Sequence, residues 1–382
     1  MRVAKVLCLY PCGVLVALVA VLFGFCANAE IPEGRAFATL IPLVGGGLLP
    51  ATIVGEAWRE KFTRVAKVPS WLAPMKRPAA ELLLPMLGGD PPMPALGLGL
   101  CCRPTAYDVA SVSRSVLWFL LQGGRHLDTA QLYLNHVGVG KGIREAIARG
   151  VPRSEMFIVT KLVPRFFSGD EPDRQVPRWL KELGVDYVDL VLLHHPEGFG
   201  PIGRCSNGTA AECRANAWRR LSKLREAGLI RHLGVSNHGI AQIEALRALE
   251  LAPVSVNQIQ YNPWAPDWQQ EVVDFCQSVG IVVTAWAPFQ GTMMQHAQVF
   301  TVQTLNEIAT ANGKSVAQVL LRWALQKKVS AIPGSSDPQH MADNLAVHTF
   351  TLSAEEMAKI DAVRSDPKAK DFFAMGFDRN MS

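Results

Sequence analysis

Eight short apolar runs that alternate with amphipathic helical stretches predict an α/β fold, a (β/α)8 TIM barrel over residues 81–382. The runs are nearly continuous in apolar residues, which is typical of parallel strands that helices cover. Eight such units in about 300 residues match the size of this barrel. A doubly wound open sheet is the alternative fold. It is disfavoured because no G-x-G-x-x-G motif follows the first strand.

The predicted strands are Leu-rich or β-branched, and they lie at 95–100, 125–128, 156–161, 187–194, 230–236, 254–258, 281–286 and 329–333. Between them, apolar residues at i, i+3 and i+4 predict helices that include 108–121, 140–150, 217–228 and 315–326. Ahead of the first strand, "ELLLPMLGGDPPMP" predicts a small hairpin that caps the bottom of the barrel, with its turn at Gly88-Gly89.

The first 29 residues predict a signal peptide or a signal anchor. Arg2 and Lys5 form a basic start, an apolar run then extends to Cys26, and the small residues "ANA" at 27–29 suit signal cleavage. The run also approaches the length that spans a membrane, so an uncleaved anchor is the alternative. Either form predicts entry into the secretory route. Contact with a membrane is expected only through residues 1–29, if they are not cleaved.

Residues 30–80 are predicted to form a leader or linker. Their first part is uncharged and interrupted by proline and glycine, and a basic tract follows. A signal followed by an acid-poor leader resembles the bipartite presequences of algae with complex plastids. A plain linker or a second membrane-associating segment is the alternative. The final compartment (ER or secreted, membrane-anchored, or a complex plastid) stays open.

The positive charge of the chain is concentrated at its start. Residues 1–80 hold nine Lys or Arg against four Glu, out of 38 Lys and Arg and 33 Asp and Glu in the whole chain. The barrel region is therefore neutral, and we expect no nucleic-acid partner.

Five of the eight cysteines follow residue 29, an odd number that leaves at least one thiol free. Cys205 and Cys213 flank a loop with the glycosylation sequon Asn207-Gly208-Thr209. A disulfide between them would be expected only in an oxidising compartment. The adjacent pair Cys101-Cys102 lacks the spacing of a zinc site. We therefore predict no metal.

Polar and aromatic residues stand at the carboxyl ends of six consecutive predicted strands: Asp128, Lys161, His194, Ser236-Asn237, Gln258 and Trp286. Barrel enzymes build their active sites on that face from residues of several strands. Tyr133 follows Asp128 in the next loop. A carboxylate, a phenol, an amine and an imidazole therefore meet at one mouth of the barrel, which predicts a site for proton transfer.

The stretches that carry these residues resemble the signatures of the aldo-keto reductases in order and spacing. They include "GGRHLDTAQLY", "FIVTKL", "DYVDLVLLHHP", "GLIRHLGVSNHGI", "VNQIQYNPW" and "VSAIPGSSDPQHMADNL", and the resemblance covers roughly residues 81–365. It implies a (β/α)8 barrel that uses a nicotinamide cofactor to reduce aldehydes and ketones. It also implies a catalytic tetrad, which falls on Asp128, Tyr133, Lys161 and His194.

These residue types suit carbonyl reduction. Hydride addition leaves negative charge on the carbonyl oxygen, which a general acid must neutralise. Tyrosine is a weak acid with a pKa near 10. An ammonium about 4 Å away at a dielectric of ~20 is worth roughly 4 kcal/mol, or about three pK units. Lys161 is therefore expected to lower the pKa of Tyr133 and Asp128 to keep Lys161 charged. A neutral His194 is expected to donate a hydrogen bond to the substrate oxygen.

The resemblance also implies a cofactor site. Ser236, Asn237 and Gln258 match the ligands of the nicotinamide carboxamide, and Trp286 takes the place of the usual stacking Tyr. The segment after the last strand matches the adenosine-phosphate site. Its predicted ligands are Ser335, Ser336, His340 and Asn344.

We expect NADPH as the cofactor, with NADH as the alternative. Relatives that prefer NADPH commonly hold the 2′-phosphate of the adenosine with a Lys and an Arg. Those positions are Gly334 and His340 here. One permanent charge is lost at the first, and histidine carries only part of a charge at neutral pH.

Some positions that face the substrate in relatives differ here. Leu100 and Cys101 replace a common Thr and an aromatic residue, and His195 replaces a common Trp. The C-terminal stretch that often lines the pocket carries three aromatic residues, Phe372, Phe373 and Phe377. We expect a monomer that acts on a small-molecule carbonyl substrate. The alternative is a nicotinamide-binding regulatory subunit or scaffold of a membrane-associated complex.

Overall fold

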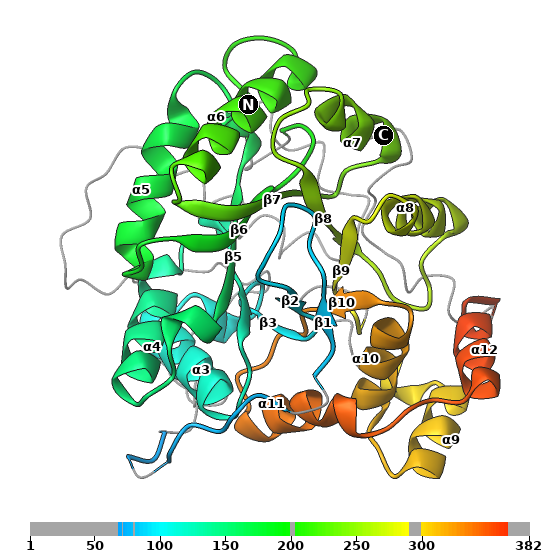
Figure 1. Cartoon of the computed structure of the whole chain (residues 1–382). Coiled ribbons are helices and arrows are strands. Elements are labelled where there is room, and N and C mark those ends of the chain that lie inside the picture. The colour runs from blue at the N-terminus through cyan, green and yellow to red at the C-terminus, as the bar shows by residue number, and fades with distance from the viewer. Residues whose placement is uncertain (1–67, 71, 79–80, 199–202, 290–298, 366–382) are drawn as a thin grey trace, which may run out of the picture.

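The computed structural model describes residues 68–70, 72–78, 81–198, 203–289 and 299–365. The predicted signal segment, most of the predicted leader, and Phe372, Phe373 and Phe377 lie outside the described residues. Within the described ranges, a ring of strands is surrounded by helices (Figure 1). Every helix in these ranges is too short or too polar to span a lipid bilayer.

The central sheet has eight parallel strands, in the order β10-β9-β8-β7-β6-β5-β4-β3. The strands are β3 (Gly97–Gly99), β4 (His126–Asp128), β5 (Phe157–Leu162), β6 (Val188–Leu193), β7 (Ile230–Ser236), β8 (Val254–Gln260), β9 (Val282–Trp286) and β10 (Val329–Ala331). The ring closes where Leu96 bridges Ala331, whose N–H donates to the Ala95 oxygen at 2.8 Å. The predicted (β/α)8 TIM barrel is confirmed.

The predicted hairpin precedes the barrel. β1 (Leu83–Leu84) and β2 (Met93–Pro94) pair antiparallel. In the turn, Gly88-Gly89 adopts φ values of 93° and 105°, which glycine tolerates because it has no Cβ. The Ser255 hydroxyl, near the start of β8, donates to the Leu87 oxygen of the hairpin at 2.6 Å. The hairpin therefore lies at the end of the barrel opposite the carboxyl ends of the strands.

The helices cover the outside of the ring and include α3 (Val109–Leu121), α4 (His136–Ala148), α5 (Glu171–Leu183), α6 (Ala210–Glu226), α7 (Ile240–Arg247), α8 (Asp267–Ser278), α9 (Gln303–Asn312), α10 (Val316–Gln326), α11 (Pro338–Leu345) and α12 (Ala354–Ala362). α3 and α10 begin one residue after their predicted starts, because the side chains of Asp108 and Ser315 accept backbone N–H bonds from the first turn.

Two helices begin earlier than predicted. α4 begins at His136 rather than at residue 140. The prediction placed the start too late because the glycine-rich first turn has low helix propensity and hides the apolar spacing of a helix. α6 begins at Ala210 rather than at residue 217. Its first turns are polar, and Thr209 fixes its start through a capping box with Glu212.

The glycines of α4 let it lie close to both neighbouring helices. A Cβ added at Gly140 would lie 2.5 Å from the Leu183 carbonyl oxygen of α5. One added at Gly142 would lie 2.6 Å from the Ser113 carbonyl oxygen of α3. Backbone oxygens cannot move aside as a flexible side chain can, so these contacts require glycine.

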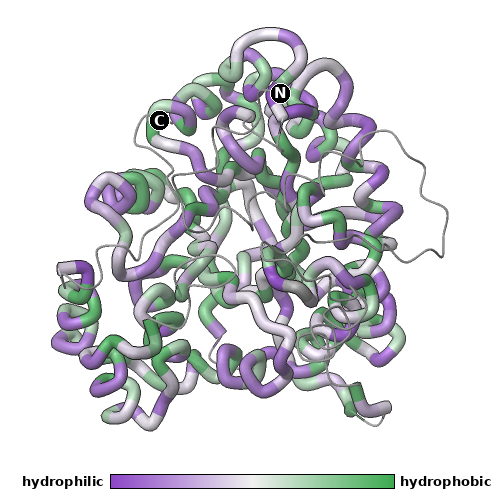
Figure 2. The backbone as a smooth tube through the Cα atoms, turned by 180° about the vertical axis from the view of Figure 1, so that it is seen from behind, coloured by the Kyte–Doolittle hydropathy of each residue, from purple (hydrophilic) through white to green (hydrophobic). Residues whose placement is uncertain are grey.

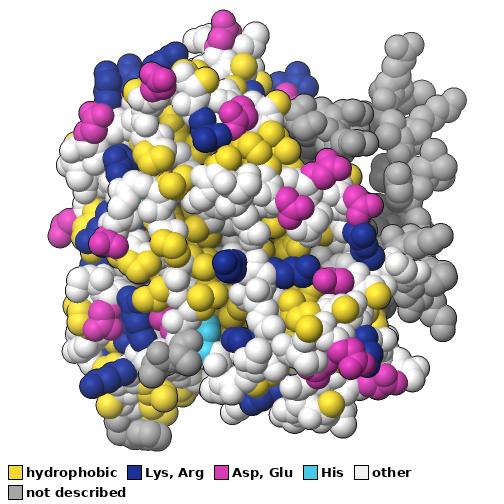
Figure 3. All heavy atoms as spheres, turned by 45° about the vertical axis from the view of Figure 1, so that its right-hand side comes forward, with side chains coloured by type: hydrophobic (Ala, Val, Ile, Leu, Met, Phe, Trp, Pro, Cys, Tyr) yellow, Lys and Arg dark blue, Asp and Glu magenta, His cyan; other side chains and the backbone are white. Residues whose placement is uncertain are grey.

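The hydropathy of the chain follows this arrangement. Figure 2 shows hydrophobic residues concentrated in the central strands and hydrophilic ones along the outer helices. β5 and β6 are buried along their whole length, as expected of strands covered on both sides. On the face seen in Figure 3, basic and acidic side chains are interspersed among apolar ones. That face therefore presents no extended region of a single charge.

Candidate active site

The four tetrad residues come from the carboxyl ends of three adjacent strands and one loop. Asp128 ends β4, Lys161 is the next-to-last residue of β5, and His194 directly follows β6. Tyr133 ends a short 3₁₀ turn (Gln131–Tyr133) in the loop between β4 and α4. The structure therefore brings these predicted residues together at one mouth of the barrel, as the order of the strands requires.

The Lys161 ammonium is fully buried and is the centre of the site. It donates to the Asp128 Oδ1 atom at 2.6 Å, to the Thr129 carbonyl oxygen at 3.0 Å and to the Tyr133 hydroxyl oxygen at 3.3 Å. An ammonium has three hydrogens, and these three acceptors use them all. Because the Tyr133 oxygen accepts from Lys161, the hydrogen of the phenol is left to point elsewhere.

Asp128 is held at both of its oxygens. Oδ1 accepts from Lys161, and Oδ2 accepts from the Gln258 side-chain amide at 2.7 Å. Burial alone would lower the pKa of Lys161, but the Asp128 carboxylate and the neighbouring Tyr133 raise it above its ordinary value. The ammonium therefore stays charged at neutral pH although it is buried.

The pKa of Tyr133 differs from the prediction. We expected Lys161 to lower it, and the charge of Lys161 does act in that direction. Burial raises the pKa by more, and Asp128 adds to the increase, so the pKa of Tyr133 lies above its ordinary value of 10.0. The prediction from distance alone was wrong because it left out desolvation of the phenolate, which opposes the ammonium.

His194 is neutral, as predicted. Burial lowers its pKa well below 6.5, and the nearby His195 and Lys161 lower it further. Its ring packs edge-on against Tyr133, with centroids 5.7 Å apart. On its other side it stacks on His195 at 5.1 Å, and burial lowers the pKa of His195 to about 4. The imidazole at position 195 thus serves as a flat neutral support in the place where relatives commonly have Trp.

The predicted carboxamide ligands form one network on the next strands. The Ser236 hydroxyl donates to the Gln258 backbone oxygen at 2.9 Å. The Asn237 amide donates to Ser236 Oγ and to the His194 backbone oxygen, both at 3.0 Å. The Trp286 indole donates to Asn237 Oδ1 at 3.0 Å, which fixes the ring beside the amide. An aromatic platform therefore lies next to amide and hydroxyl groups at the mouth of the barrel.

The predicted phosphate ligands lie beyond β10. Ser335 and Asn344 are buried, Ser336 is half-buried and His340 is exposed at the start of α11. The backbone N–H of His340 already donates to the Asp337 side chain at 3.1 Å. Ser335 contacts the loop after β3, because its backbone oxygen accepts from the Arg103 guanidinium at 2.9 Å.

A residue of that loop was missed by the sequence reasoning. The Arg103 guanidinium donates to the Gly99 carbonyl oxygen at 2.7 Å and to the Ser335 carbonyl oxygen at 2.9 Å. Its partner is 232 positions away in the sequence, so no local pattern could have identified the contact. An arginine in the loop after the first barrel strand was the available signal.

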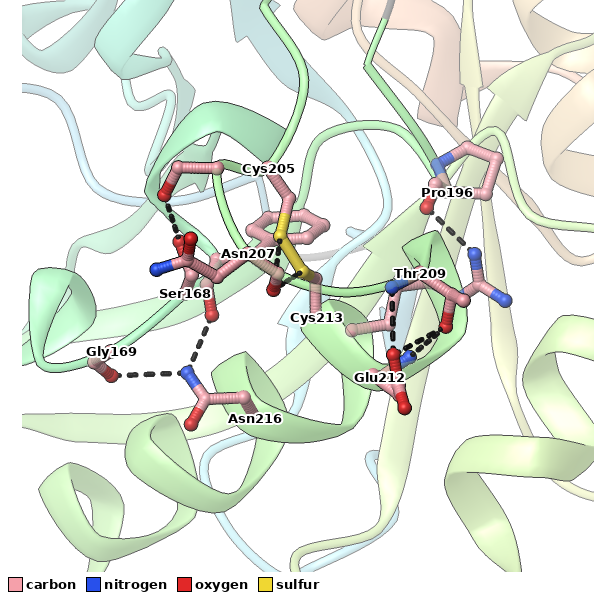
Figure 4. The surroundings of a disulfide bond; sticks show 12 residues. Ser168, Gly169, Pro196, Cys205, Asn207, Thr209, Glu212, Cys213 and Asn216 are labelled. Carbon is pink, nitrogen blue, oxygen red and sulfur yellow. Dashed lines mark hydrogen bonds between the residues drawn. A yellow bond between two sulfur atoms is a disulfide. The ribbon is translucent and has the colours of Figure 1, made fainter.

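The cysteines fall into two bonded pairs and one free thiol among the residues that the structure describes. Cys205 and Cys213 form a disulfide that closes the loop before α6, with Cα atoms 6.4 Å apart (Figure 4). Cys101 and Cys102 are joined to each other, and Cys276 is free and buried. Within the same ranges, no three His, Cys, Asp or Glu side chains gather as they would around a metal.

The barrel and its mouth define the class of protein. A phenol that can donate a proton, an ammonium fixed beside it and a neutral imidazole are groups suited to acid catalysis at a substrate oxygen. The sequence model of the Aldo/keto reductase family matches residues 95–365. The chain therefore belongs to the aldo/keto reductase family and is an oxidoreductase.

Individual relatives agree with this assignment. The chain is 34% identical over 291 residues to the Aldo-keto reductase AKR2E4 of Bombyx mori, covering 74% of this chain and 92% of that protein. It is 34% identical over 292 residues to the NAD(P)H-dependent D-xylose reductase of Scheffersomyces stipitis, covering 70% and 90%. The crystal structure of the Bombyx mori protein in complex with NADP matches with a TM-score of 0.65 at 31% identity, covering 76% and 98%.

Proposed function

We propose that the protein reduces an aldehyde or a ketone to an alcohol with NAD(P)H, and that Tyr133 is the proton donor. The observation that carries the proposal is the contact between Lys161 Nζ and the Tyr133 hydroxyl oxygen at 3.3 Å. Because the ammonium can only donate, the phenol accepts there and keeps its own hydrogen for a substrate oxygen.

The residues at the mouth fit a nicotinamide cofactor. When bound, the reduced nicotinamide supplies the hydride. Trp286 offers a flat π-face that is fixed by its bond to Asn237. Ser236, Asn237 and Gln258 offer hydroxyl and amide groups at the ends of neighbouring strands, which suit a carboxamide.

The chain's own residues divide the remaining work. Tyr133 transfers its proton to the substrate oxygen as negative charge develops there. Lys161 stabilises the phenolate that remains, and Asp128 holds Lys161 in place at 2.6 Å. A neutral His194 can donate one hydrogen bond to the same oxygen without competing as an acid.

The relatives support the same chemistry. One is named an NAD(P)H-dependent D-xylose reductase, another a Glyoxal reductase of Bacillus subtilis. A related aldo-keto reductase has been crystallised with NADPH. We therefore propose NADPH as the cofactor and a small carbonyl compound as the substrate.

The test is a screen of the purified full-length protein against aldehydes, ketones and alcohols, following nicotinamide absorbance with NADPH and with NADH. We expect turnover with at least one small carbonyl compound. Cofactor binding without turnover of any substrate would contradict the proposal and would favour a nicotinamide-binding regulatory subunit.

A further inference from the structure

Arg103 joins the loop after the first barrel strand to the loop after the last. It precedes a 3₁₀ turn (Pro104–Ala106), and its side chain reaches across to Ser335. Both of its hydrogen-bond partners, Gly99 and Ser335, offer backbone carbonyl oxygens. These bonds fix the direction of the guanidinium but do not neutralise its charge.

The charge of Arg103 has no acidic partner among the described residues. Burial alone lowers the pKa of Arg103 to about 10, with no carboxylate acting against it. The group is therefore still a cation at neutral pH. Its Nε atom is buried and has no hydrogen-bond partner in the part of the chain that the structure describes. A cation that is largely removed from water and has an unused N–H donor is unfavourable unless an anion neutralises its charge and accepts from that donor.

The Arg103 cation lies directly beside Gly334. A Cβ added to Gly334 would lie 2.6 Å from the Arg103 Nη1 atom. A side chain at position 334 would therefore have to displace the Arg103 guanidinium from its present position. The space beside the first residue after the Ile-Pro of the last strand is occupied by a guanidinium from a different loop.

Other groups nearby do not supply a permanent positive charge. The Ser335 hydroxyl is already bonded to the Asp337 backbone, at 3.3 Å to its oxygen and 3.1 Å from its N–H. A guanidinium has five N–H donors in a plane, and Arg103 uses two of them in the bonds to Gly99 and Ser335. Planar donors of this kind match two oxygens of a phosphate.

We propose that Arg103 binds the 2′-phosphate of the cofactor's adenosine and so gives this enzyme its preference for NADPH over NADH. The proposal rests on the proposed function, because it assumes that the segment after β10 receives the adenosine. It assigns the discriminating charge to the loop after β3 instead of to position 334.

The first test measures binding of two fragments to the full-length protein by calorimetry, with no substrate or nicotinamide present. 2′,5′-ADP carries the 2′-phosphate, and 5′-AMP lacks it. We expect the wild type to bind 2′,5′-ADP about 10- to 100-fold more tightly, as charge-assisted hydrogen bonds allow. Arg103→Ala should abolish this difference in affinity between 2′,5′-ADP and 5′-AMP, and it should leave the affinity for 5′-AMP unchanged. Arg103→Lys should keep part of it.

The second test exchanges the two positions. Gly334→Lys alone should not strengthen binding of 2′,5′-ADP, because the lysine would displace the Arg103 cation while it supplies its own. In the double variant Arg103→Ala/Gly334→Lys the lysine has room, and the tighter binding of 2′,5′-ADP than of 5′-AMP should return. Arg103→Gln, which keeps an amide donor for the carbonyl oxygens, provides a second neutral variant if Arg103→Ala does not fold.

Three results would overturn the proposal. The wild type could bind both fragments equally, or Arg103→Ala could weaken both by the same factor, which would place Arg103 at the other phosphates. The double variant could also fail to recover the ratio although it folds. The proposed function is tested separately, since equal turnover with NADPH and NADH would contradict the role of Arg103 while leaving carbonyl reduction intact.

Discussion

The three acceptors of the Lys161 ammonium determine which neighbouring groups are left free to donate a hydrogen bond. Since one of them is the phenol oxygen of Tyr133, the phenol keeps its own hydrogen to donate to another group. The raised pKa of Tyr133 favours the protonated form, which is the form that reduction needs. In the proposed reduction, this protonated phenol is the group that gives its proton to the substrate oxygen.

Tyr133→Phe tests the proton donor directly. We expect kcat for carbonyl reduction to fall by about 10²- to 10⁴-fold, the usual contribution of a positioned acid. Cofactor affinity, measured by fluorescence quenching, should stay close to that of the wild type because the phenol does not contact the predicted nucleotide ligands. If the variant kept more than about a tenth of the wild-type kcat, Tyr133 would not be the acid.

Lys161→Met tests the coupling between the ammonium and the phenol. The Lys161 charge lowers the pKa of Tyr133 against the larger effect of burial, so its removal should raise that pKa further. Alcohol oxidation requires the phenolate, and its onset should therefore move to higher pH. At a fixed pH below this pKa, the phenolate fraction falls about tenfold each time the pKa rises by one.

The pH–rate profile of alcohol oxidation is the measurement for this prediction. Asp128→Asn should move the onset less, because it removes only the partner that holds the ammonium. Lys181→Met deletes the same charge at an exposed position of α5 and serves as the control. An unchanged onset in Lys161→Met would show that the two groups are not coupled.

Three residues of the proposed tetrad could be predicted from sequence because each stands at the end of an apolar run. Asp128, Lys161 and His194 all have this position, and the barrel brings such positions together. The bond from Gln258 to Asp128 spans 130 residues, and that from Arg103 to Ser335 spans 232. Neither contact leaves a local pattern, so neither could be predicted.

At the scale of elements, strands were easier to predict than helix starts. Strands buried on both sides are marked by continuous apolar residues, and the predicted segments overlap every strand of the barrel. The starts of α4 and α6 were placed too late, because their first turns lack a regular spacing of apolar residues. Packing against neighbouring helices stabilises the first turn of α4, and a capping box stabilises that of α6. Packing between neighbouring helices overrides the low propensity of glycine in α4.

Gly142→Ala tests that packing. Alanine is the better helix former by about 1 kcal/mol, so propensity alone predicts stabilisation. The added Cβ would lie 2.6 Å from the Ser113 carbonyl oxygen, and we expect overpacking to dominate, with a net loss of about 1–3 kcal/mol. Urea denaturation followed by circular dichroism is the measurement.

Lys141→Ala, at an exposed position of the same helix, is the matched control and should leave the midpoint unchanged or slightly higher. A Gly142→Ala variant as stable as this control would mean that α3 and α4 can separate without cost.

At the scale of the whole molecule, the disulfide-closed loop bears on the route of the protein through the cell. Asn207 is exposed, and Thr209 completes its sequon while capping α6 (Figure 4). We propose that the chain enters the secretory route and that Asn207 is glycosylated there. Expression of the full-length chain in eukaryotic cells should give a product whose mobility changes on treatment with peptide N-glycosidase F.

Variants of Thr209 separate the sequon from the helix cap. Thr209→Ser keeps both and should remain glycosylated, whereas Thr209→Asp keeps the cap and should lose the glycan. Asn207→Gln should lose it as well. A wild-type protein that stays in the cytosol without a glycan would contradict entry into the secretory route, whether or not it is active.

The closure of the barrel between Leu96 and Ala331 has a consequence for biosynthesis. The strand that begins the ring leaves the ribosome long before the strand that completes it. Residues 128–194, which carry the tetrad, are made while the seam is still open. The contact between Arg103 and Ser335 forms only when the last strand is in place. A chain that ends before residue 329 would contain all four residues of the proposed tetrad but could not close the barrel. The proposed binding of the nucleotide at Arg103 would therefore require the complete barrel.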